Sequence, residues 1–403
     1  MKNIILLITT FFFIFSLVLM GQQQTSDGGY IIAGSTESYT NGETDFLVYK
    51  LNAAGQKQWR KNYGGLYWDT ASMIKQTSDG GYIVAGISDS YTNPPGGPCD
   101  FLLYKLNAAG QKQWRKSFGG ALCDHAYGVI QTSDSGFLVI GDTWNWVHGT
   151  FGDDEDFLVY KLSASGAKQW RKNYGGAEWD YGLRAVQTTD GGYAFVGYTQ
   201  SYTNGLTDVL VYKVDAAGNK QWRKNYGGTE YEYGQFIRQT ADGGYILCGR
   251  TDSYVHVTES MKGVSYPEDI LVYKLNAAGA KQWRKNYGGG DFDEGYDIRQ
   301  TAAGGYVFCG LTRSYTHGAD DMIVYRVNAA GAKLWRKNYG GTLSDEAKYI
   351  APCSDGGFML FGSGYSYTNG VSDFLVYRLD AVGTKQWRKN YGGINYEFVY
   401  VWD

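Results

Sequence analysis

The chain has 403 residues, of which 43% are apolar and 19% charged, so it can bury a core and is not an intrinsically disordered protein. Its formal net charge of −3 argues against a general nucleic-acid-binding protein, which would ordinarily be basic. Many Gly (57) and Tyr (36) residues and only five Pro residues favour an all-β protein with many tight turns.

Residues 1–21 have the pattern of a secretory signal peptide. Lys2 supplies the positive start, the stretch from Ile4 to Met20 has no charged residue, and Gly21 is a small residue at the expected cleavage point. The run is long for a signal peptide, so an uncleaved membrane anchor is the alternative. Cleavage predicts a secreted, periplasmic or cell-surface protein without a membrane span.

Residues 22–403 consist of one repeated unit. Six units begin with Gln, at 24, 76, 131, 187, 239 and 300, and Pro352 begins the seventh. We expect four strands per unit, in the second unit at 71–77 (strand a), 81–86 (b), 100–106 (c) and 111–118 (d). Ser-Asp-Gly and Asn-Ala-Ala-Gly segments suit the a–b and c–d turns. Because such units cannot bury their faces alone, we predict an all-β, seven-bladed β-propeller of four-stranded blades.

The two ends of the chain complement each other. The first unit lacks a strand a, because the repeat begins directly after residues 1–21. The final segment "GGINYEFVYVWD" (392–403) aligns with "GGLYWDTASMIK" (64–75), which leads into strand a of the second unit. We therefore expect the C-terminal strand to complete the first blade and close a monomeric ring.

The loops between strands b and c are where the units differ in length. These b–c loops are longer by 3, 4 and 9 residues in the second, third and fifth units. In an antiparallel blade the b–c and d–a loops share one face, and variable loops on a rigid scaffold are the usual place for binding.

Aromatic and acidic residues in these loops are the candidate ligand-binding residues. A sugar site needs flat apolar faces to stack on and acceptors for hydroxyl groups. Acidic oxygens in the third unit could instead bind calcium, and such residues are also ordinary in loops. The candidates are Trp68, Trp144, Trp146, Phe151, Asp153, Asp154, Trp179 and Tyr266.

An acidic residue opens strand a in every unit. If strand a is innermost, these acids surround the mouth of the channel and need hydrogen-bond donors, a cation or raised pKa values to relieve their repulsion. The alternative is that each accepts backbone N–H groups of its own loop. The acids are Asp69, Asp124, Asp180, Glu232, Asp293, Asp345 and Glu397.

Basic residues, cysteines and histidines give weaker signals. Three basic residues in each strand d, with Lys50 and its equivalents, predict a positive belt on the outer rim, which either attracts polyanions or keeps an edge strand charged. Cys99 and Cys123 could form a disulfide. His125 is the one His within a predicted strand and follows Asp124, which is a weak catalytic signal.

Every unit carries a Trp in a Lys-x-Trp-Arg-Lys segment of strand d, which we expect to pack on the neighbouring blade. With its turn, as in "LNAAGQKQW", this segment resembles the tryptophan-docking motif of quinoprotein propellers, although it lacks the Thr before the Gly and is one residue shorter. The whole unit more closely resembles the "DGGYIVAG…W.K.YGG" repeats of exported bacterial and archaeal kelch-like propellers. That resemblance implies fold and export. The tryptophans are Trp59, Trp114, Trp170, Trp222, Trp283, Trp335 and Trp387.

The sequence contains no Gly-x-Ser-x-Gly motif, no phosphate-binding Gly-rich loop and no His pair at metal spacing. We therefore expect an exported, non-enzymatic binding or scaffold propeller without a cofactor, calcium excepted, that recognises glycans or an extracellular protein. The alternatives are a carbohydrate-active hydrolase or lyase, a divergent quinoprotein, and a purely structural surface component.

Overall fold

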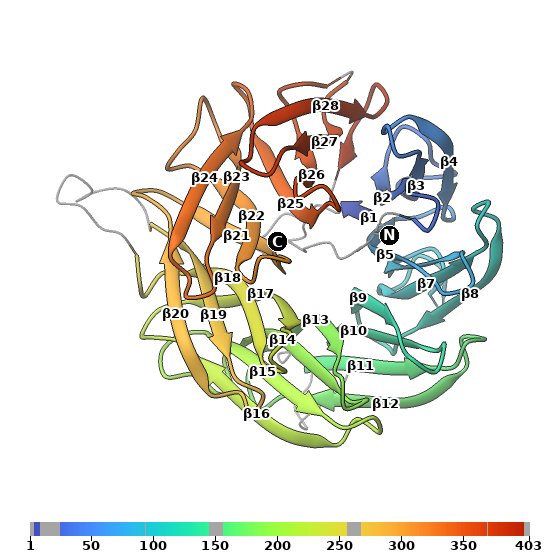
Figure 1. Ribbon diagram of the computed structural model, residues 1–403. Helices are drawn as coiled ribbons and strands as arrows, with labels where there is room; N and C mark the ends of the chain where they lie inside the picture. Colours follow the sequence, from blue (N-terminus) through green and yellow to red (C-terminus); the bar gives the residue numbers. More distant parts are fainter. Residues whose placement is uncertain are drawn as a thin grey trace.

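The protein is an all-β, seven-bladed propeller (Figure 1). The computed structural model describes residues 4–8, 25–92, 94–144, 156–255, 267–368 and 370–398, with the backbone alone at 4–8 and 397–398. Six blades are four-stranded antiparallel sheets and the first has five strands, which confirms the predicted fold class. Within the described ranges, no helix has the length and apolar character needed to cross a membrane.

The four strands of each blade follow the order expected from the repeat, from the ring centre outward (Figure 1). Strands a are β5 (Asp69–Gln76), β9 (Asp124–Gln131), β13 (Asp180–Gln187), β17 (Glu232–Gln239), β21 (Asp293–Gln300), β25 (Asp345–Pro352) and β29 (Glu397–Phe398). Strands b are β2 (Tyr30–Thr36), β6 (Tyr82–Ser88), β10 (Phe137–Thr143), β14 (Tyr193–Thr199), β18 (Tyr245–Thr251), β22 (Tyr306–Thr312) and β26 (Phe358–Gly364). Strands c are β3 (Asp45–Leu51), β7 (Asp100–Leu106), β11 (Asp156–Leu162), β15 (Asp208–Val214), β19 (Asp269–Leu275), β23 (Asp321–Val327) and β27 (Asp373–Leu379). Strands d are β4 (Lys57–Tyr63), β8 (Lys112–Phe118), β12 (Lys168–Tyr174), β16 (Lys220–Tyr226), β20 (Lys281–Tyr287), β24 (Lys333–Tyr339) and β28 (Lys385–Tyr391).

The core lies between the blades. Strands b and c are buried along nearly their whole length, because both faces of each sheet contact a neighbouring blade. Their sequences are accordingly runs of Val, Ile, Leu and aromatic residues, as in strands buried on both faces. Strands d consist mainly of exposed and partly buried residues, since they form the outer rim. The repeated units therefore bury their apolar faces only when they are stacked around the ring.

The repeated Trp packs each blade on the next, as the sequence predicted. Trp59 of the first blade lies edge-on to Tyr82 of the second, with ring centroids 6.1 Å apart. A Cβ on Gly110, in the c–d turn of the second blade, would stand only 2.9 Å from the Trp59 ring. Five further pairs repeat the ring contact: Trp114–Phe137, Trp170–Tyr193, Trp222–Tyr245, Trp283–Tyr306 and Trp335–Phe358.

The ring closes between the seventh and first blades through the same contacts. The Trp387 ring lies against Gly55, where a Cβ would be 3.2 Å away, and Tyr391 donates its hydroxyl proton to the Gly55 carbonyl. Lys389 also donates to the Ala54 carbonyl. Closure therefore uses the ordinary interface between blades.

Both ends of the chain add strands to the first blade. Glu397 pairs with Thr36 and Phe398 with Ser35, so β29 begins strand a as expected from the sequence. Beside it, β1 (Ile4–Ile8) pairs in parallel with Tyr30–Gly34. In the other blades strand a continues along this edge of strand b, whereas residues 399–403 lie outside the described part of the chain. Removal of residues 1–21 as a signal peptide stays a prediction.

One column of basic residues was misplaced by the sequence analysis. Lys50 was expected on the outer rim but is buried, with 4% of its surface exposed. Its ammonium group lies 2.9 Å from the Asp27 carboxylate in the a–b turn and also donates to the Leu51 carbonyl. An ion pair between this buried ammonium group and a half-exposed carboxylate replaces the expected solvent contact. The same pair recurs as Lys105–Asp79, Lys161–Asp134, Lys213–Asp190 and Lys274–Asp242.

Candidate functional site

A cavity of about 300 Å³ opens between the second and third blades. Its walls come from the d–a loops before β5 and β9, the b–c loops after β6 and β10, and the ends of the adjoining strands. These loops belong to the face that the sequence identified as variable. The lining residues with chemical interest are Trp68, Asp89, Cys99, Cys123, His125 and Trp144.

The two tryptophans are positioned by equivalent backbone hydrogen bonds. The Trp68 carbonyl accepts from Asp89 N at 2.8 Å, which ties the d–a loop to the b–c loop of the same blade. In the third blade Trp144 N donates to the Cys123 carbonyl at 3.0 Å. Trp144 keeps 40% of its surface exposed. Two indole rings from adjacent blades therefore border one cavity.

Asp89 supplies a carboxylate to the cavity wall. Burial, together with the negative charge of Asp69, raises the pKa of Asp89 to about 6, against the opposing charge of His125. At neutral pH the carboxylate is mostly ionised and can accept hydrogen bonds from hydroxyl groups of a ligand. Below pH 6 it becomes protonated and loses that strength as an acceptor.

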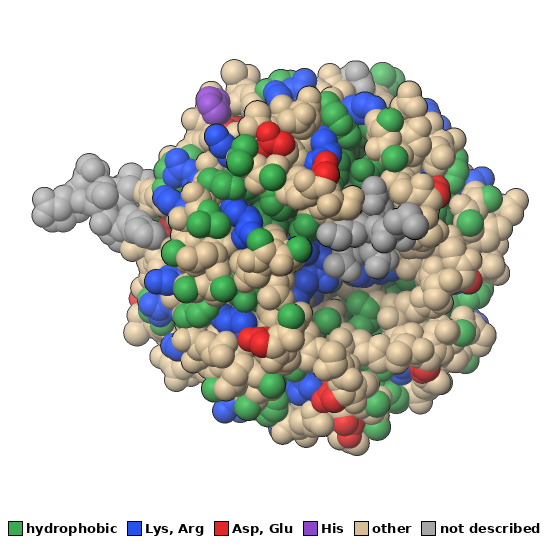
Figure 2. Space-filling model, viewed as in Figure 1, with side chains coloured by type: hydrophobic (Ala, Val, Ile, Leu, Met, Phe, Trp, Pro, Cys, Tyr) green, Lys and Arg blue, Asp and Glu red, His purple; other side chains and the backbone are tan. Residues whose placement is uncertain are grey.

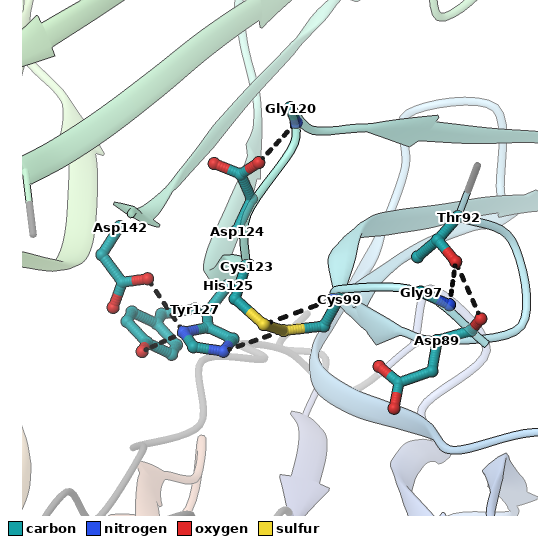
Figure 3. Close-up of a disulfide and its surroundings, with 10 residues drawn as sticks. All are labelled: Asp89, Thr92, Gly97, Cys99, Gly120, Cys123, Asp124, His125, Tyr127 and Asp142. Carbon is teal, nitrogen blue, oxygen red and sulfur yellow. Dashed lines mark hydrogen bonds and ion pairs between the residues drawn. A yellow bond between two sulfur atoms is a disulfide. The ribbon is translucent and has the colours of Figure 1, made fainter. Parts of the chain in front are cut away.

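A disulfide and a histidine also line the cavity, and Figure 3 shows how they lie relative to each other. Cys99, at the end of the b–c loop of the second blade, is bonded to Cys123, in the loop that leads into the third blade. His125 Nε2 lies 3.1 Å from Cys99 Sγ, and its Nδ1 lies 2.9 Å from Asp142 Oδ1. Asp142 stands directly opposite His125 in the pairing of β9 with β10. Antiparallel register thus fixes the imidazole between a carboxylate and a disulfide.

The two cysteines and His125 are also the candidate metal ligands. In the part of the chain that the structure describes, one group of three or more His, Cys, Asp or Glu residues has its ligand atoms within 4.8 Å: Cys99, Cys123 and His125. A metal binds thiolates, which the disulfide does not offer, so this group suits a thiophilic metal only after reduction. Sulfur and nitrogen donors do not suit calcium, and Asp153 and Asp154 lie outside the described residues.

The predicted acids at the start of strand a are turned into the protein. Six are at most 1% exposed, and each accepts a hydrogen bond from a Gly N–H of its own d–a loop at 2.6–2.9 Å. Burial raises the pKa of Asp69 and that of Asp293 to about 6. This is the loop-bonding arrangement that the sequence left as the alternative. The six acids are Asp69, Asp124, Asp180, Glu232, Asp293 and Asp345; the side chain of Glu397 is outside the described set.

Of the remaining candidates, Trp179 is the one that the structure describes. Trp179 occupies the same repeat position as Trp68 and is 43% exposed, but it belongs to the fourth blade and does not line the cavity. Trp146, Phe151, Asp153, Asp154 and Tyr266 lie in segments outside the described residues. Of the three described candidates, Trp68 and Trp144 share this cavity and Trp179 does not.

Sequence reasoning missed the pairing of His125 with Asp142. The available signal was a single one: strand b has Asp after its last Gly in the third unit, where the other units have Ser, Ile, Tyr, Arg or Leu. His125 and the two cysteines had each been noted separately. What could not be read from the sequence was that all four side chains meet.

A second cluster that the sequence analysis missed lies at the centre of the ring. Burial, together with the positive charge of Arg238, lowers the pKa of Lys75 to about 7. Burial raises the pKa of Asp297, against the opposing charge of Arg238, and Arg299 donates to Asp297 at 3.0 Å. Arg184 belongs to the same group, since it also affects Lys75. Figure 2 shows Lys and Arg side chains around the middle of the ring.

Comparisons with known proteins support the fold. Residues 25–57 match a family model described as a domain of unknown function (DUF5122) beta-propeller. No match was found among curated proteins. Solved structures that align include a variant of the apocarotenoid oxygenase of Synechocystis, at 9% identity and a TM-score of 0.52 over 90% of this chain and 87% of that chain. A chimera of that oxygenase with RPE65 aligns at 9% identity and 0.53, over 90% and 86%. At such low identity these likenesses concern the propeller fold alone.

Proposed function

We propose that this protein is an exported, non-enzymatic binding propeller that recognises a glycan through the cavity between its second and third blades. The observation that carries the proposal is the meeting of Trp68 and Trp144, from different blades, at one cavity with the Asp89 carboxylate. Indole rings stack on the apolar faces of sugar rings, and a carboxylate accepts hydrogen bonds from their hydroxyl groups.

The size and position of the cavity support this proposal. A volume of about 300 Å³ is at the lower end for small-molecule sites, which suits the end of a saccharide chain. The loops that form the cavity lie on a rigid ring, so their aromatic residues are held in place before the ligand arrives and lose little entropy on binding. The proposed location is secreted, periplasmic or at the cell surface.

Binding of purified protein to a glycan array, followed by calorimetry on the glycans that bind, tests the proposal. We expect Trp68→Ala and Trp144→Ala each to weaken binding at least tenfold, which corresponds to about 1.4 kcal/mol. Trp179→Ala is the matched control, because Trp179 occupies the same repeat position as Trp68 but lies outside the cavity. It should bind like the wild type.

Three outcomes contradict the proposal. They are binding to no glycan, equal affinity in all three variants, and release of glycan fragments or unsaturated products, which would favour the alternative of a hydrolase or lyase. Unchanged thermal unfolding of each variant, compared with the wild type, shows that a loss of binding is not a loss of folding.

A further inference from the structure

The Cys99–Cys123 disulfide differs from a buried structural disulfide because it borders an open cavity. Cys99 is buried, with 9% of its surface exposed, whereas Cys123 is partly exposed. A thiol that enters the cavity can therefore approach Cys123 more easily than Cys99. In thiol–disulfide exchange the sulfur that is attacked is set largely by access, and the other sulfur leaves as a thiolate.

A proton donor is placed beside the sulfur that would leave. His125 Nε2 lies 3.1 Å from Cys99 Sγ, and the Asp142 carboxylate, which is fully buried, lies 2.9 Å from Nδ1 (Figure 3). The Tyr127 hydroxyl is also 3.3 Å from Nδ1. In the imidazolium form, Nδ1–H donates to Asp142 and Nε2–H points at Cys99. A histidine in this geometry is suited to act as a general acid.

The disulfide is not needed to hold the two blades together. Asp124 N donates to the Cys99 carbonyl at 2.7 Å across this boundary. The equivalent bond forms at boundaries without cysteine, as Asp69 N to the Thr44 carbonyl and Glu232 N to the Thr207 carbonyl, both at 2.8 Å. The backbone contact therefore remains when the sulfur–sulfur bond is broken, so the bond can open and close on a folded ring.

We propose that Cys99–Cys123 is a reactive disulfide that exchanges with thiols, with Cys123 as the sulfur attacked and Cys99 as the leaving group. A thiolate bonds to Cys123 Sγ as the disulfide breaks, and the electron pair passes to Cys99 Sγ, which takes the proton of His125 Nε2. A second thiolate then attacks the sulfur of the first thiol in the mixed disulfide. The two small thiols become joined as a disulfide, and Cys123 leaves as a thiolate. Two thiols are oxidised and the protein disulfide is reduced to two thiols.

Exchange with reduced glutathione tests the proposal in the full chain, with a chelator present to remove metal ions. The mixed disulfide is trapped after short reaction by alkylation and mapped by mass spectrometry. We expect glutathione on Cys123 and the alkyl group on Cys99. Glutathione on Cys99 instead, or a disulfide that resists glutathione while the protein is folded, would overturn the proposal. This arm needs no substitution and is independent of glycan binding.

The role of His125 is tested by the rate of the same reaction. His125→Gln should slow reduction at least tenfold, because the leaving Cys99 thiolate loses its proton donor. His317→Asn is the matched control: His317 lies in the sixth blade, at a position where other units have Asn, and its loss should leave the rate unchanged. An equal rate in His125→Gln and wild type, with both folded by thermal unfolding, would contradict the acid role of His125.

Discussion

At the scale of single residues, the a–b turn explains why five of the seven units carry Asp-Gly-Gly. The Asp accepts from the buried Lys of strand c, and the first Gly takes a positive φ, as at Gly28 (79°) and Gly80 (78°). In the third unit Ser135 occupies this Gly position, with φ of 63°. Among the described residues it is the one non-glycine residue with a positive φ, which is unfavourable for a residue with a Cβ atom.

Replacing Ser135 by Gly should therefore stabilise the protein. We expect the free energy of unfolding to rise by about 0.5–1 kcal/mol, as the backbone strain removed exceeds the entropy that Gly adds to the unfolded chain. The reverse substitution, Gly80→Ser, should lower the free energy of unfolding by about the same amount. A Cβ there meets nothing within 4 Å, so the backbone strain is the cause of the loss. Denaturant unfolding of both variants checks this; a loss of stability in Ser135→Gly would contradict it.

At the scale of secondary-structure elements, the boundary between the second and third blades differs from the others. At the end of strand d a Tyr donates its hydroxyl proton to the Gly carbonyl in the c–d turn of the next blade, as in Tyr174 to Gly218 at 2.7 Å. The second blade has Phe118 at this position. Its boundary therefore lacks this hydrogen bond, and it is the boundary that carries the disulfide and the cavity.

Phe118→Tyr should restore the missing bond, to the Gly166 carbonyl. The adjacent Trp114 ring already lies against Gly166, where a Cβ would be 3.2 Å away, so the two elements have the spacing of the other boundaries. We expect a gain of about 0.5–1.5 kcal/mol in the free energy of unfolding. Tyr174→Phe, the reverse change at the next boundary, should lose a similar amount. If Phe118→Tyr destabilises the ring, the boundary is packed differently from its equivalents.

At the scale of the whole molecule, the carboxylates respond to pH in two opposite groups, one buried or half-buried between the blades and one half-exposed in the a–b turns. Burial raises the pKa of Asp69, Asp89 and Asp293 to about 6, despite hydrogen bonds to Asp69 and Asp293 that lower it. In the a–b turns burial also favours the neutral acid, but hydrogen bonds to the carboxylate outweigh this effect. Those from Lys161 and its neighbours bring the pKa of Asp134 to about 2. Asp190 and Asp242 behave in the same way.

These shifts predict a maximum of stability near pH 4–5. The stability linked to a raised carboxyl pKa is present below the unfolded value, about 4, and is lost as pH rises through 6. The stability linked to the lowered pKa values is present above the unfolded value and is lost as pH falls through 2. We expect a higher Tm at pH 5 than at pH 7.5 and a lower one at pH 2. Asp134→Asn should weaken the fall on the acid side, and a Tm that rises steadily from pH 5 to 7.5 would contradict the prediction.

Most of the architecture could be predicted from the sequence, because repetition makes each element evident several times. The Gln and Trp columns set the number of blades, the turn residues set the strand order, and the alignment of 392–403 with 64–75 showed how the ring closes. All of this depends on local pattern and on the fact that one unit cannot bury its own faces.

The surroundings of each side chain were decided by the tertiary structure. Lys50 and the acids that open strand a look like surface charges in the sequence, yet they are buried in the folded ring. Lys50 pairs with Asp27 of the a–b turn, and each acid accepts a backbone hydrogen bond from its own d–a loop. Trp68 and Trp179 occupy one repeat position, but only Trp68 lines the cavity, since the other wall comes from the next blade. A repeated sequence determines the ring, whereas a site between two blades depends on how their two different loops meet in space.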